Sequence, residues 1–552
     1  LGVRMQSAIA YSLNEIERTQ NIKIEPDQIP LDDAKTFDLI ASTRTLGVFQ
    51  IESPGQRELI GKFAPSSFND LIIDISLFRP GPVKSDMITP FLAARHGLRA
   101  PLIIHPKLDS IMAETEGVVV FHEQVIKLIS IMTGISLAAA DEKRRELGTL
   151  DGQQAVCDWF YPAAIANGFS LSVVQEIWQI LRAFASFGFC KAHAAAFALP
   201  TYQSAWLKTH YTAAFLAGVL THDPGMYPKR LILADAKQWG IKILPVDVNK
   251  SAATYTVELI SLDKNNGLTT YQAPDLKSTG RKLQLPDARG FAIRVALSDI
   301  DGISEQEVST IISARPYLDL ADFVRRSGAS RPTAEALVAL GGFADLHQNL
   351  NQRDLLLHLQ DLYKLNYQPI SQDQMVLALL PPPLAATGLP EITQSEKVTT
   401  ELKLLGMDVS NHVLSFYGDF LNSIKAIRSS DVIMQRSGAS VLVAGIKVAL
   451  QTPPVRSGRR VMFLTLDDGY GCNDITFFED IQRSCANLLR TSSLFLVRGV
   501  LRRTGPRGVS IRASEVWDLP SLYEQYKLEK TQQIKELTKE QIKEQSDDAR
   551  VS

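Results

Sequence analysis

Apolar side chains recur at helical spacing through most of the first half of the chain. In the opening stretch, the residues that fall on one helical face are Met5, Ile9, Leu13 and Ile16. The same spacing of three and four returns in residues 174–184 and 201–216. Because this is the period of an amphipathic α-helix, we predict a mainly helical first half with buried apolar faces.

Between the last two of these helices, residues 183–198 combine aromatic groups, a cation and a titratable ring. Gly188 permits a tight bend, and Lys191 and His193 follow it at the start of an alanine-rich helix. A helix start offers free N–H groups and the positive end of the helix dipole, so the stretch suits an anionic ligand. The alternative is a helical hairpin with a C-capping glycine and a hydrogen-bonded buried histidine.

Two further stretches place cations where they could meet phosphate. The sequence Phe-Arg-Pro-Gly-Pro holds Arg79 on a rigid turn, because proline fixes the backbone and excludes a helix. Lys143, Arg144 and Arg145 form a continuous cationic run. Guanidinium groups bind phosphate bidentately, but they also form salt bridges and lie on solvated helix faces. Spacing alone leaves both interpretations open.

Residues 300–304 read Ile-Asp-Gly-Ile-Ser and precede an apolar helical pattern. A glycine turn of this kind, with Gly302 at its centre, presents backbone N–H groups beside a helix start. Such turns are typical of helix-hairpin-helix elements that hold a DNA phosphate. A second helical pair is indicated at residues 331–343. We therefore predict a tandem helix-hairpin-helix module, with an ordinary small helical bundle as the alternative.

Residues 440–517 alternate apolar and polar positions, with turn residues between about five short strands and one helix. That order predicts an OB-fold, a barrel that often binds single-stranded nucleic acid through basic and aromatic groups on one face. A purely structural role is also compatible with this fold. The candidate binding residues are Arg456, Arg459, Arg460, Phe463, Arg502, Arg503 and Arg507.

A proline-rich stretch separates these two modules and reads as a linker. Within it, Gln372 is followed by Met375 and Val376, an arrangement similar to peptides that bind a sliding clamp. The aromatic residue usual in such peptides is absent, so a chance match is the alternative.

Composition narrows the class of protein. The chain has 552 residues, too many for one core, and three or four domains are expected. The formal net charge of −2 excludes a globally basic nucleic-acid coat but allows local basic patches. Four cysteines are too few for a disulfide framework and indicate reducing, cytoplasmic surroundings. Because no apolar run reaches about 18 residues and no signal peptide is evident, we expect no membrane partner.

Taken together, these stretches resemble the bacterial C-family DNA polymerases, the family of the alpha subunit of DNA polymerase III. Over roughly the first 250 residues, the matching stretches come in the family's order. They are Gly47-Val-Phe-Gln-Ile-Glu-Ser, Leu77-Phe-Arg-Pro-Gly-Pro, Phe121-His-Glu-Gln-Val, Arg144-Arg-Glu-Leu-Gly, Phe187-Gly-Phe-Cys-Lys-Ala-His-Ala-Ala-Ala-Phe-Ala and Tyr202-Gln-Ser-Ala-Trp-Leu-Lys. The hairpin module and the OB-fold then follow where the family places them.

The resemblance implies a fingers domain that grips the incoming deoxynucleoside triphosphate and the templating base of primer-template DNA. By position, the nucleotide-binding residues would be Arg144, Arg145, Phe187, Lys191 and His193. Arg79 would support this pocket or the DNA backbone, and Gly302 and the basic and aromatic OB-fold residues would bind DNA. A sliding clamp, through Gln372, Met375 and Val376, and other replication or lesion-bypass subunits are the implied protein partners.

The family's nucleotidyl transfer needs two Mg²⁺ ions held by three palm carboxylates. Two of these belong to a Pro-Asp-x-Asp-x-Asp-Phe motif, which this sequence lacks. The third precedes a Leu-Gly-Leu-Arg-like segment, and this chain begins Leu1-Gly-Val-Arg. We therefore expect a fragment that starts just after the palm aspartates, contains no catalytic metal ligand and is inactive alone.

Several positions depart from the replicative pattern. Cys190 stands where replicative members usually carry asparagine, and Ala192 and Ala194 replace small hydroxyl residues. These differences leave the choice between the replicative and the error-prone, damage-tolerant branch open.

Two other classes of function were weighed against a polymerase. A non-catalytic, single-stranded-DNA-binding accessory protein would use only the hairpins and the OB-fold, so Arg144→Ala and Arg145→Ala would change nothing in the cell. A zinc site through Cys190 and His193 would need two further ligands, of which Cys157 and His210 are the nearest candidates.

The expected fold class is multidomain α+β, with a mainly α-helical fingers domain, a tandem helix-hairpin-helix module and a C-terminal OB-fold barrel. The expected domains are 1–50 (end of the palm and entry to the fingers), 51–285 (fingers), 286–364 (helix-hairpin-helix), 365–428 (linker), 429–518 (OB-fold) and 519–552 (charged tail).

Overall fold

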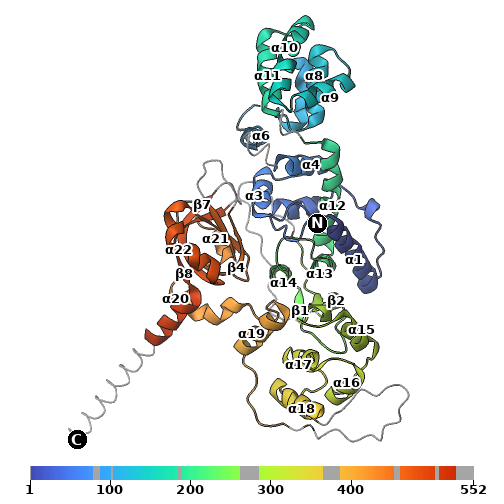
Figure 1. The fold of residues 1–552 in the computed structure, drawn as a ribbon, viewed down its shortest axis with the longest axis vertical. Coiled ribbons are helices and arrows are strands. Elements are labelled where there is room, and N and C mark those ends of the chain that lie inside the picture. The colour runs from blue at the N-terminus through green and yellow to red at the C-terminus, as the bar shows by residue number, and fades with distance from the viewer. Residues whose placement is uncertain are drawn as a thin grey trace, which may run out of the picture.

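The chain forms an elongated molecule with a helical body at its centre and three smaller units around it (Figure 1). A helical unit lies at one end, a hairpin-rich module lies at the other, and a barrel lies beside the body. The computed structural model describes residues 2–78, 88–100, 104–184, 189–261, 285–364, 384, 386–452, 461–503 and 509–529.

The body is built from helices that share one large apolar core. Its helices are α1 (Gly2–Gln20), α2 (Ala34–Ala41), α3 (Pro54–Phe63), α4 (Phe68–Leu77), α6 (Ile88–Arg95), α12 (Lys191–His210), α13 (Thr212–His222) and α14 (Lys229–Gln238), with a 3₁₀ turn η1 (Pro26–Gln28). Helix α1 packs along α13, and α12 packs against α4 and α2. Side-chain caps define several starts, as where Asp33 accepts the Thr36 N–H before α2.

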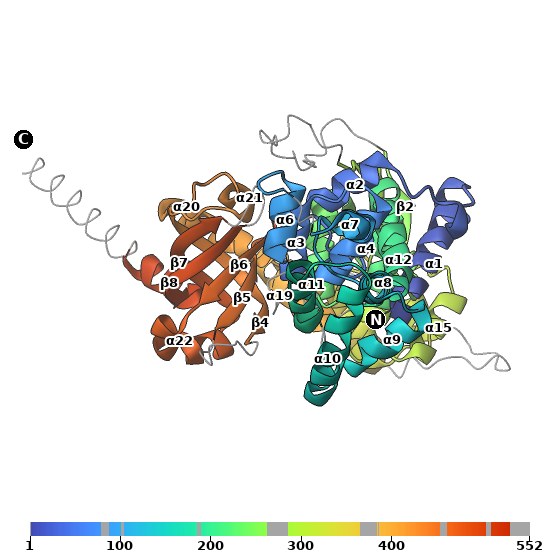
Figure 2. The ribbon, with the colours of Figure 1, turned by 90° about the horizontal axis from the view of Figure 1, so that it is seen from above.

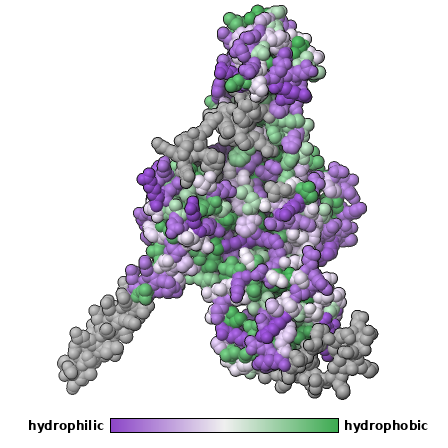
Figure 3. All heavy atoms as spheres, in the orientation of Figure 1, coloured by the Kyte–Doolittle hydropathy of each residue, from purple (hydrophilic) through white to green (hydrophobic). Residues whose placement is uncertain are grey.

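The unit at the end of the molecule has a core of its own, which includes the tilted ring pair Phe160 and Trp178 at 6.0 Å. Its elements are α7 (Pro106–Met112), η2 (Ala113–Thr115), α8 (His122–Thr133), α9 (Leu137–Glu146), α10 (Leu150–Ala166) and α11 (Leu171–Phe184). On the face shown in Figure 3, hydrophilic residues dominate its surface, as expected for a separately packed unit. We call residues 104–184 the upper unit.

No single helix in the described parts of the chain has both the length and the apolar composition needed to cross a membrane. Helices α8 and α9 meet those criteria only as a pair, and they meet at an angle of 113°.

A small sheet joins the body to the hairpin-rich module. Strand β3 (Phe291–Arg294) lies between β1 (Lys242–Leu244), which runs parallel to it, and β2 (Thr256–Leu259), which runs antiparallel. The module follows as η3 (Leu297–Asp299), α15 (Glu305–Ser313), α16 (Leu320–Arg326), α17 (Arg331–Ala339) and α18 (Gln352–Lys364).

The carboxylate of Glu307 ties the starts of two hairpin helices together. It accepts hydrogen bonds from the backbone N–H and the hydroxyl of Ser304, from the Ser330 N–H and from the Thr333 hydroxyl, at 2.8–3.0 Å. Burial opposes the charged form, but these bonds prevail and lower the pKa of Glu307 to about 2. The carboxylate therefore fixes α15 against α17 across the physiological pH range.

The last part of the chain forms a closed five-stranded barrel. Its strands are β4 (Ser440–Gln451), β5 (Met462–Asp467), β6 (Cys472–Phe477), β7 (Leu494–Arg503) and β8 (Val509–Asp518), in the order β4-β5-β6-β8-β7. Helix α22 (Glu479–Thr491) lies between β6 and β7, and the connection from the hairpins runs through α19 (Gln394–Leu405), η4 (Val413–Tyr417), α20 (Gly418–Ser423) and α21 (Ser429–Val432). This is the OB-fold order, so the predicted fold class is confirmed.

Candidate nucleotide and nucleic-acid interface

The start of α12 lies where the upper unit meets the body. Phe121 and Phe189 form a parallel bridge, and the His122 N–H donates to the Phe189 carbonyl at 2.9 Å. Glu123 on α8 accepts the Lys191 backbone N–H with both carboxylate oxygens, each at 3.0 Å. A carboxylate at this position caps the helix and opposes its positive dipole end. The predicted helix start is therefore present, but one of its free donors already has an acceptor within the chain.

The side chains of Lys191 and His193 point into the same junction. The Lys191 amine donates to Glu114 at 2.6 Å and lies 5.5 Å from the centre of the Phe121 ring. The His193 ring lies 4.6 Å from the Phe197 ring and 5.4 Å from that of Phe189. Because this ion pair is partly exposed, an incoming anion could displace Glu114 from Lys191 at little cost. The contact is therefore compatible with the predicted nucleotide-binding role of Lys191.

The two arginines predicted to bind triphosphate lie at the end of α9. Asp141 accepts from Arg144 at 2.8 Å and from Arg145 at 2.6 Å, and these bonds, led by that of Arg144, lower the pKa of Asp141. The Arg145 side chain is 71% exposed, whereas that of Arg144 is 21% exposed. Because exposed ion pairs are weak, Arg145 can exchange Asp141 for a phosphate at little cost.

Within the described residues, no hydrogen bond or ion pair joins the arginine pair on α9 to Lys191 or His193. Phe187 and Arg79, which were predicted for the same pocket, lie outside the described residues. The grouping of these five residues around one nucleotide therefore stays a prediction.

The zinc hypothesis finds no geometric basis in this region. His193 and His210 lie near opposite ends of α12, roughly 25 Å apart along its axis at about 1.5 Å per residue. His210 instead contacts Asp33, with 2.8 Å between Nε2 and Oδ2. Across the residues that the structure describes, no group of three or more His, Cys, Asp or Glu side chains could hold a metal ion.

A candidate interface lies in a cleft between the barrel and α3, with a volume of about 1010 Å³. In both ribbon views α3 lies on the side of the body that faces the barrel (Figures 1 and 2). The barrel wall is formed by the outward residues of β5 and β6, the strands through which OB-folds commonly bind oligonucleotides. We call this space the OB cleft.

The sheet register brings aromatic and basic side chains together on this wall. Phe463 pairs with Thr476, Thr476 pairs with Arg512, and Arg502 pairs with Ser510 on the neighbouring strands. Phe463 is 40% exposed in the cleft, and Arg502 lines it as well. An exposed ring beside guanidinium groups is the usual surface for stacking bases and neutralising phosphates.

The opposite wall and the floor of the cleft carry residues that the sequence did not reveal. Arg57 on α3 lines the cleft, and its guanidinium lies 3.7 Å from Asp474 on β6. Asn473 is only 3% exposed, and among the described residues neither its amide nitrogen nor the Nε of Arg57 has a hydrogen-bond partner. Two buried donors without acceptors beside a cleft are what a bound anion would satisfy.

The other predicted DNA contacts fall into two groups. The Arg503 guanidinium donates to the backbone carbonyls of Ile433 and Gln435, so it holds the chain before β4. Gly302 adopts φ +80°, and no atom of the described part of the chain lies within 4 Å of where its Cβ would be, as a turn that approaches a DNA backbone requires. Outside the described residues lie the basic turn (Arg456, Arg459, Arg460), Arg507 and the clamp-like peptide (Gln372, Met375, Val376).

Three stretches of the chain match known domain families. Residues 5–167 match the finger domain of the bacterial DNA polymerase III alpha subunit, residues 240–354 a helix-hairpin-helix motif, and residues 441–519 an OB-fold nucleic acid binding domain. These matches make the chain similar to a region of the bacterial C-family DNA polymerase alpha subunits. The resemblance seen in the sequence motifs is thereby confirmed, and the three matches come in the order in which the structure places these units.

Some of the curated relatives are named error-prone DNA polymerase and others DNA polymerase III subunit alpha. The chain is 33% identical to an error-prone DNA polymerase from Symbiobacterium thermophilum over 526 residues, which is 90% of this chain and 47% of that protein. It is 30% identical to the DNA polymerase III subunit alpha of Neisseria meningitidis serogroup A over 543 residues, or 95% of this chain and 44% of that protein. The chain therefore spans about half the length of the curated relatives it matches.

Proposed function

We propose that this chain contributes nucleotide binding and DNA binding to a DNA-directed DNA polymerase in bacterial replication or lesion bypass. The upper unit and the start of α12 would bind the incoming deoxynucleoside triphosphate through Arg144, Arg145, Phe187, Lys191 and His193. The OB cleft would hold single-stranded template DNA. The observation that carries the proposal is the OB cleft itself, in a chain similar to this family.

Template binding in the OB cleft rests on complementary chemistry from two parts of the chain. Phe463 offers a ring for base stacking, and Arg502 offers a cation for the backbone on the same wall. Arg57 and Asn473 supply donors from the opposite wall and the floor, where phosphate oxygens would complete their hydrogen bonding. A strand in this cleft would contact the body and the barrel at once.

Mg²⁺ belongs to the proposed reaction, but the described residues do not fit a two-metal site. Such a site needs clustered carboxylates, and no metal-holding group of three or more side chains occurs in the described ranges. We therefore assign no step of catalysis to this part of the chain. Its residues would bind and orient the nucleotide and the template.

Replacing Phe463 with Ala should weaken the binding of single-stranded DNA by roughly 5- to 150-fold, because one base–aromatic stack is worth about 1–3 kcal/mol. Arg502→Gln should lower the slope of log K against log salt by about 0.7, the value for one lost phosphate contact. Fluorescence anisotropy with a labelled oligothymidylate measures both. Arg483→Gln, an exposed arginine on α22, is the matched control. Unchanged binding in both variants would exclude the OB cleft as the DNA site.

Arg145→Gln should raise the KM for deoxynucleoside triphosphates by about 10- to 100-fold in primer extension by the native polypeptide, because a charge-assisted phosphate contact is lost. Arg182→Gln, an exposed arginine on α11 in the same unit, should leave KM unchanged. If Arg145→Gln has no effect while Phe463→Ala abolishes DNA binding, the accessory-protein alternative is favoured instead.

A further inference from the structure

A second pocket lies between α14 of the body and the barrel, with a volume of about 510 Å³. Its walls come from four segments: α14, the connection that includes η4 and α20, strand β4, and the turn between β5 and β6. The volume lies in the range of sites for small organic ligands, about 300–1,000 Å³. It shares no lining residue with the OB cleft, so none of Phe463, Arg502 and Arg57 lines it.

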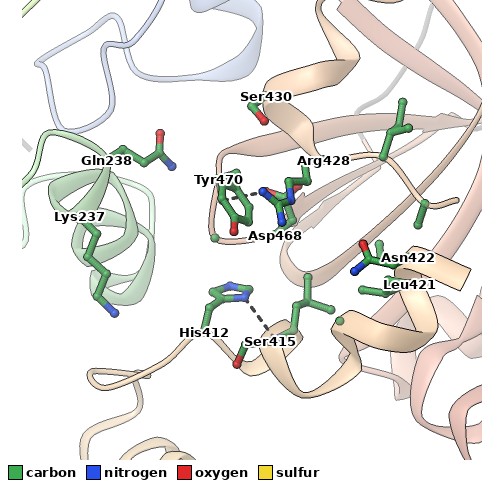
Figure 4. A pocket seen from close by; sticks show the side chains of 16 residues that line it. Lys237, Gln238, His412, Ser415, Leu421, Asn422, Arg428, Ser430, Asp468 and Tyr470 are labelled. Carbon is green, nitrogen blue, oxygen red and sulfur yellow. Dashed lines mark hydrogen bonds between the residues drawn. The ribbon is translucent and has the colours of Figure 1, made fainter. Parts of the chain in front are cut away.

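Aromatic rings and a free cation face the open space of this pocket. Figure 4 shows Tyr470 and His412 on opposite sides of the opening, with Arg428 beside Tyr470. The Arg428 guanidinium lies 4.2 Å from the centre of the Tyr470 ring, which is itself on a 46% exposed side chain. In the described parts of the chain, this guanidinium donates no hydrogen bond, so its donors are available to a ligand.

Among the described residues that line the pocket, the one carboxylate, that of Asp468, already has hydrogen-bond donors within the chain. Asp468 accepts from the Ser429 N–H and hydroxyl at 2.6 and 2.7 Å, and from the Tyr470 and Gly471 N–H groups at 2.9 and 3.0 Å. These bonds fix the turn that carries Tyr470, although burial outweighs them and raises the pKa of Asp468. An anion in the pocket would therefore meet the free guanidinium rather than an unpaired carboxylate.

Amide and amine groups complete the lining. Lys237 donates to the Val409 carbonyl at 2.8 Å and retains two further N–H donors, while Asn422 presents its amide from α20. Gln238 has its carbonyl oxygen bound by Arg44, which leaves its NH₂ group for a ligand. Such groups recognise the edges of planar heterocycles as well as phosphate oxygens.

We propose that this pocket binds a nucleoside monophosphate. The base would lie between the rings of Tyr470 and His412, and the phosphate would meet the Arg428 guanidinium. Since the walls belong to the body, the connection and the barrel, an occupied pocket would favour the arrangement in which these three parts lie together. The site is separate from the proposed template cleft and from the proposed triphosphate site on the upper unit.

The test is isothermal titration calorimetry of the full chain with deoxyadenosine monophosphate. We expect saturable binding that weakens about tenfold or more in Arg428→Gln and in Tyr470→Leu, since each variant removes a charge-assisted or stacking contact. Arg436→Gln, an exposed arginine of the same segment outside the pocket, should bind as the parent does. Inorganic phosphate and deoxyadenosine should each bind at least about tenfold more weakly than the nucleotide.

Two results would overturn the proposal. One is no binding up to about 5 mM nucleotide, a concentration that detects even millimolar affinity. The other is binding that survives Arg428→Gln but is lost in Arg145→Gln, which would place the nucleotide on the upper unit. A related outcome is that Arg428→Gln weakens the binding of oligothymidylate while no mononucleotide binds. The pocket would then be part of the DNA-binding surface, so the proposal would fail and the proposed function would stand.

Discussion

Lys208→Met should lower the free energy of unfolding by about 3–5 kcal/mol, because it leaves a buried carboxylate without its cation. The Lys208 side chain is completely buried, and its amine donates to Asp235 and to the Leu46 carbonyl, both at 2.7 Å. Burial lowers the pKa of Lys208, against the opposing effect of Asp235. Asp235 also accepts the Trp239 indole N–H at 3.0 Å, so the pair connects α12, α14 and the loop before α3.

Urea unfolding followed by tryptophan fluorescence, together with hydrogen exchange in α14, would measure this loss. The double variant Lys208→Met, Asp235→Asn should recover much of it, since no charge stays buried and the amide oxygen still accepts from Trp239. Lys143→Met, which breaks a solvent-exposed pair with Glu146, should cost under about 1 kcal/mol. A similar small cost for Lys208→Met would mean that water reaches Asp235 once the lysine is removed.

Gly218→Ala should destabilise the body by about 1–3 kcal/mol, because α1 and α13 cross closely at this residue. A Cβ on Gly218 would lie 2.5 Å from the Ala8 carbonyl oxygen and 2.7 Å from the Ser12 hydroxyl. The backbone cannot yield locally, so the two helices would have to move apart. Thermal unfolding measures the effect.

Gly418→Ala is the matched control for that substitution. Gly418 is also helical, at the start of α20, but a Cβ there meets no atom of the described residues within 4 Å. The substitution should be neutral or slightly stabilising, by up to about 1 kcal/mol. Equal losses at both glycines would show that helix crowding is not the cause.

Local patterns predicted the elements of this fold well because their causes are local. The helical period placed α1, and the alanine-rich stretch placed the start of α12 at Lys191. Alternation and turn residues gave the strands of the barrel, whose closure in the OB order could be expected from their number and from the position of α22. The domain boundaries, in contrast, stay predictions.

The candidate site was less predictable because its partners are distant in sequence. The carboxylate of Glu123 reaches the Lys191 N–H from another helix, so a start that looked open in the sequence carries a cap. Arg57 meets the barrel strand β6 only because the chain returns to α3 after several hundred residues. The spacing of apolar residues along one segment cannot predict such a long-range contact. In the same way, the motif Tyr-Gln-Ser-Ala-Trp-Leu-Lys contains Lys208 but does not reveal that its buried partner is Asp235.

The closure of the barrel has a consequence for how the protein behaves in a crowded solution. Strand β4 pairs with both β5 and β7, so this sheet offers no unpaired edge to another chain. The edges of the small sheet in the described ranges are β1 and β2, which are only three and four residues long. Long, flat edges are the usual templates for intermolecular strand addition and aggregation. The topology of these two sheets therefore disfavours aggregation by strand addition. The barrel can expose a binding surface without exposing an unpaired strand edge.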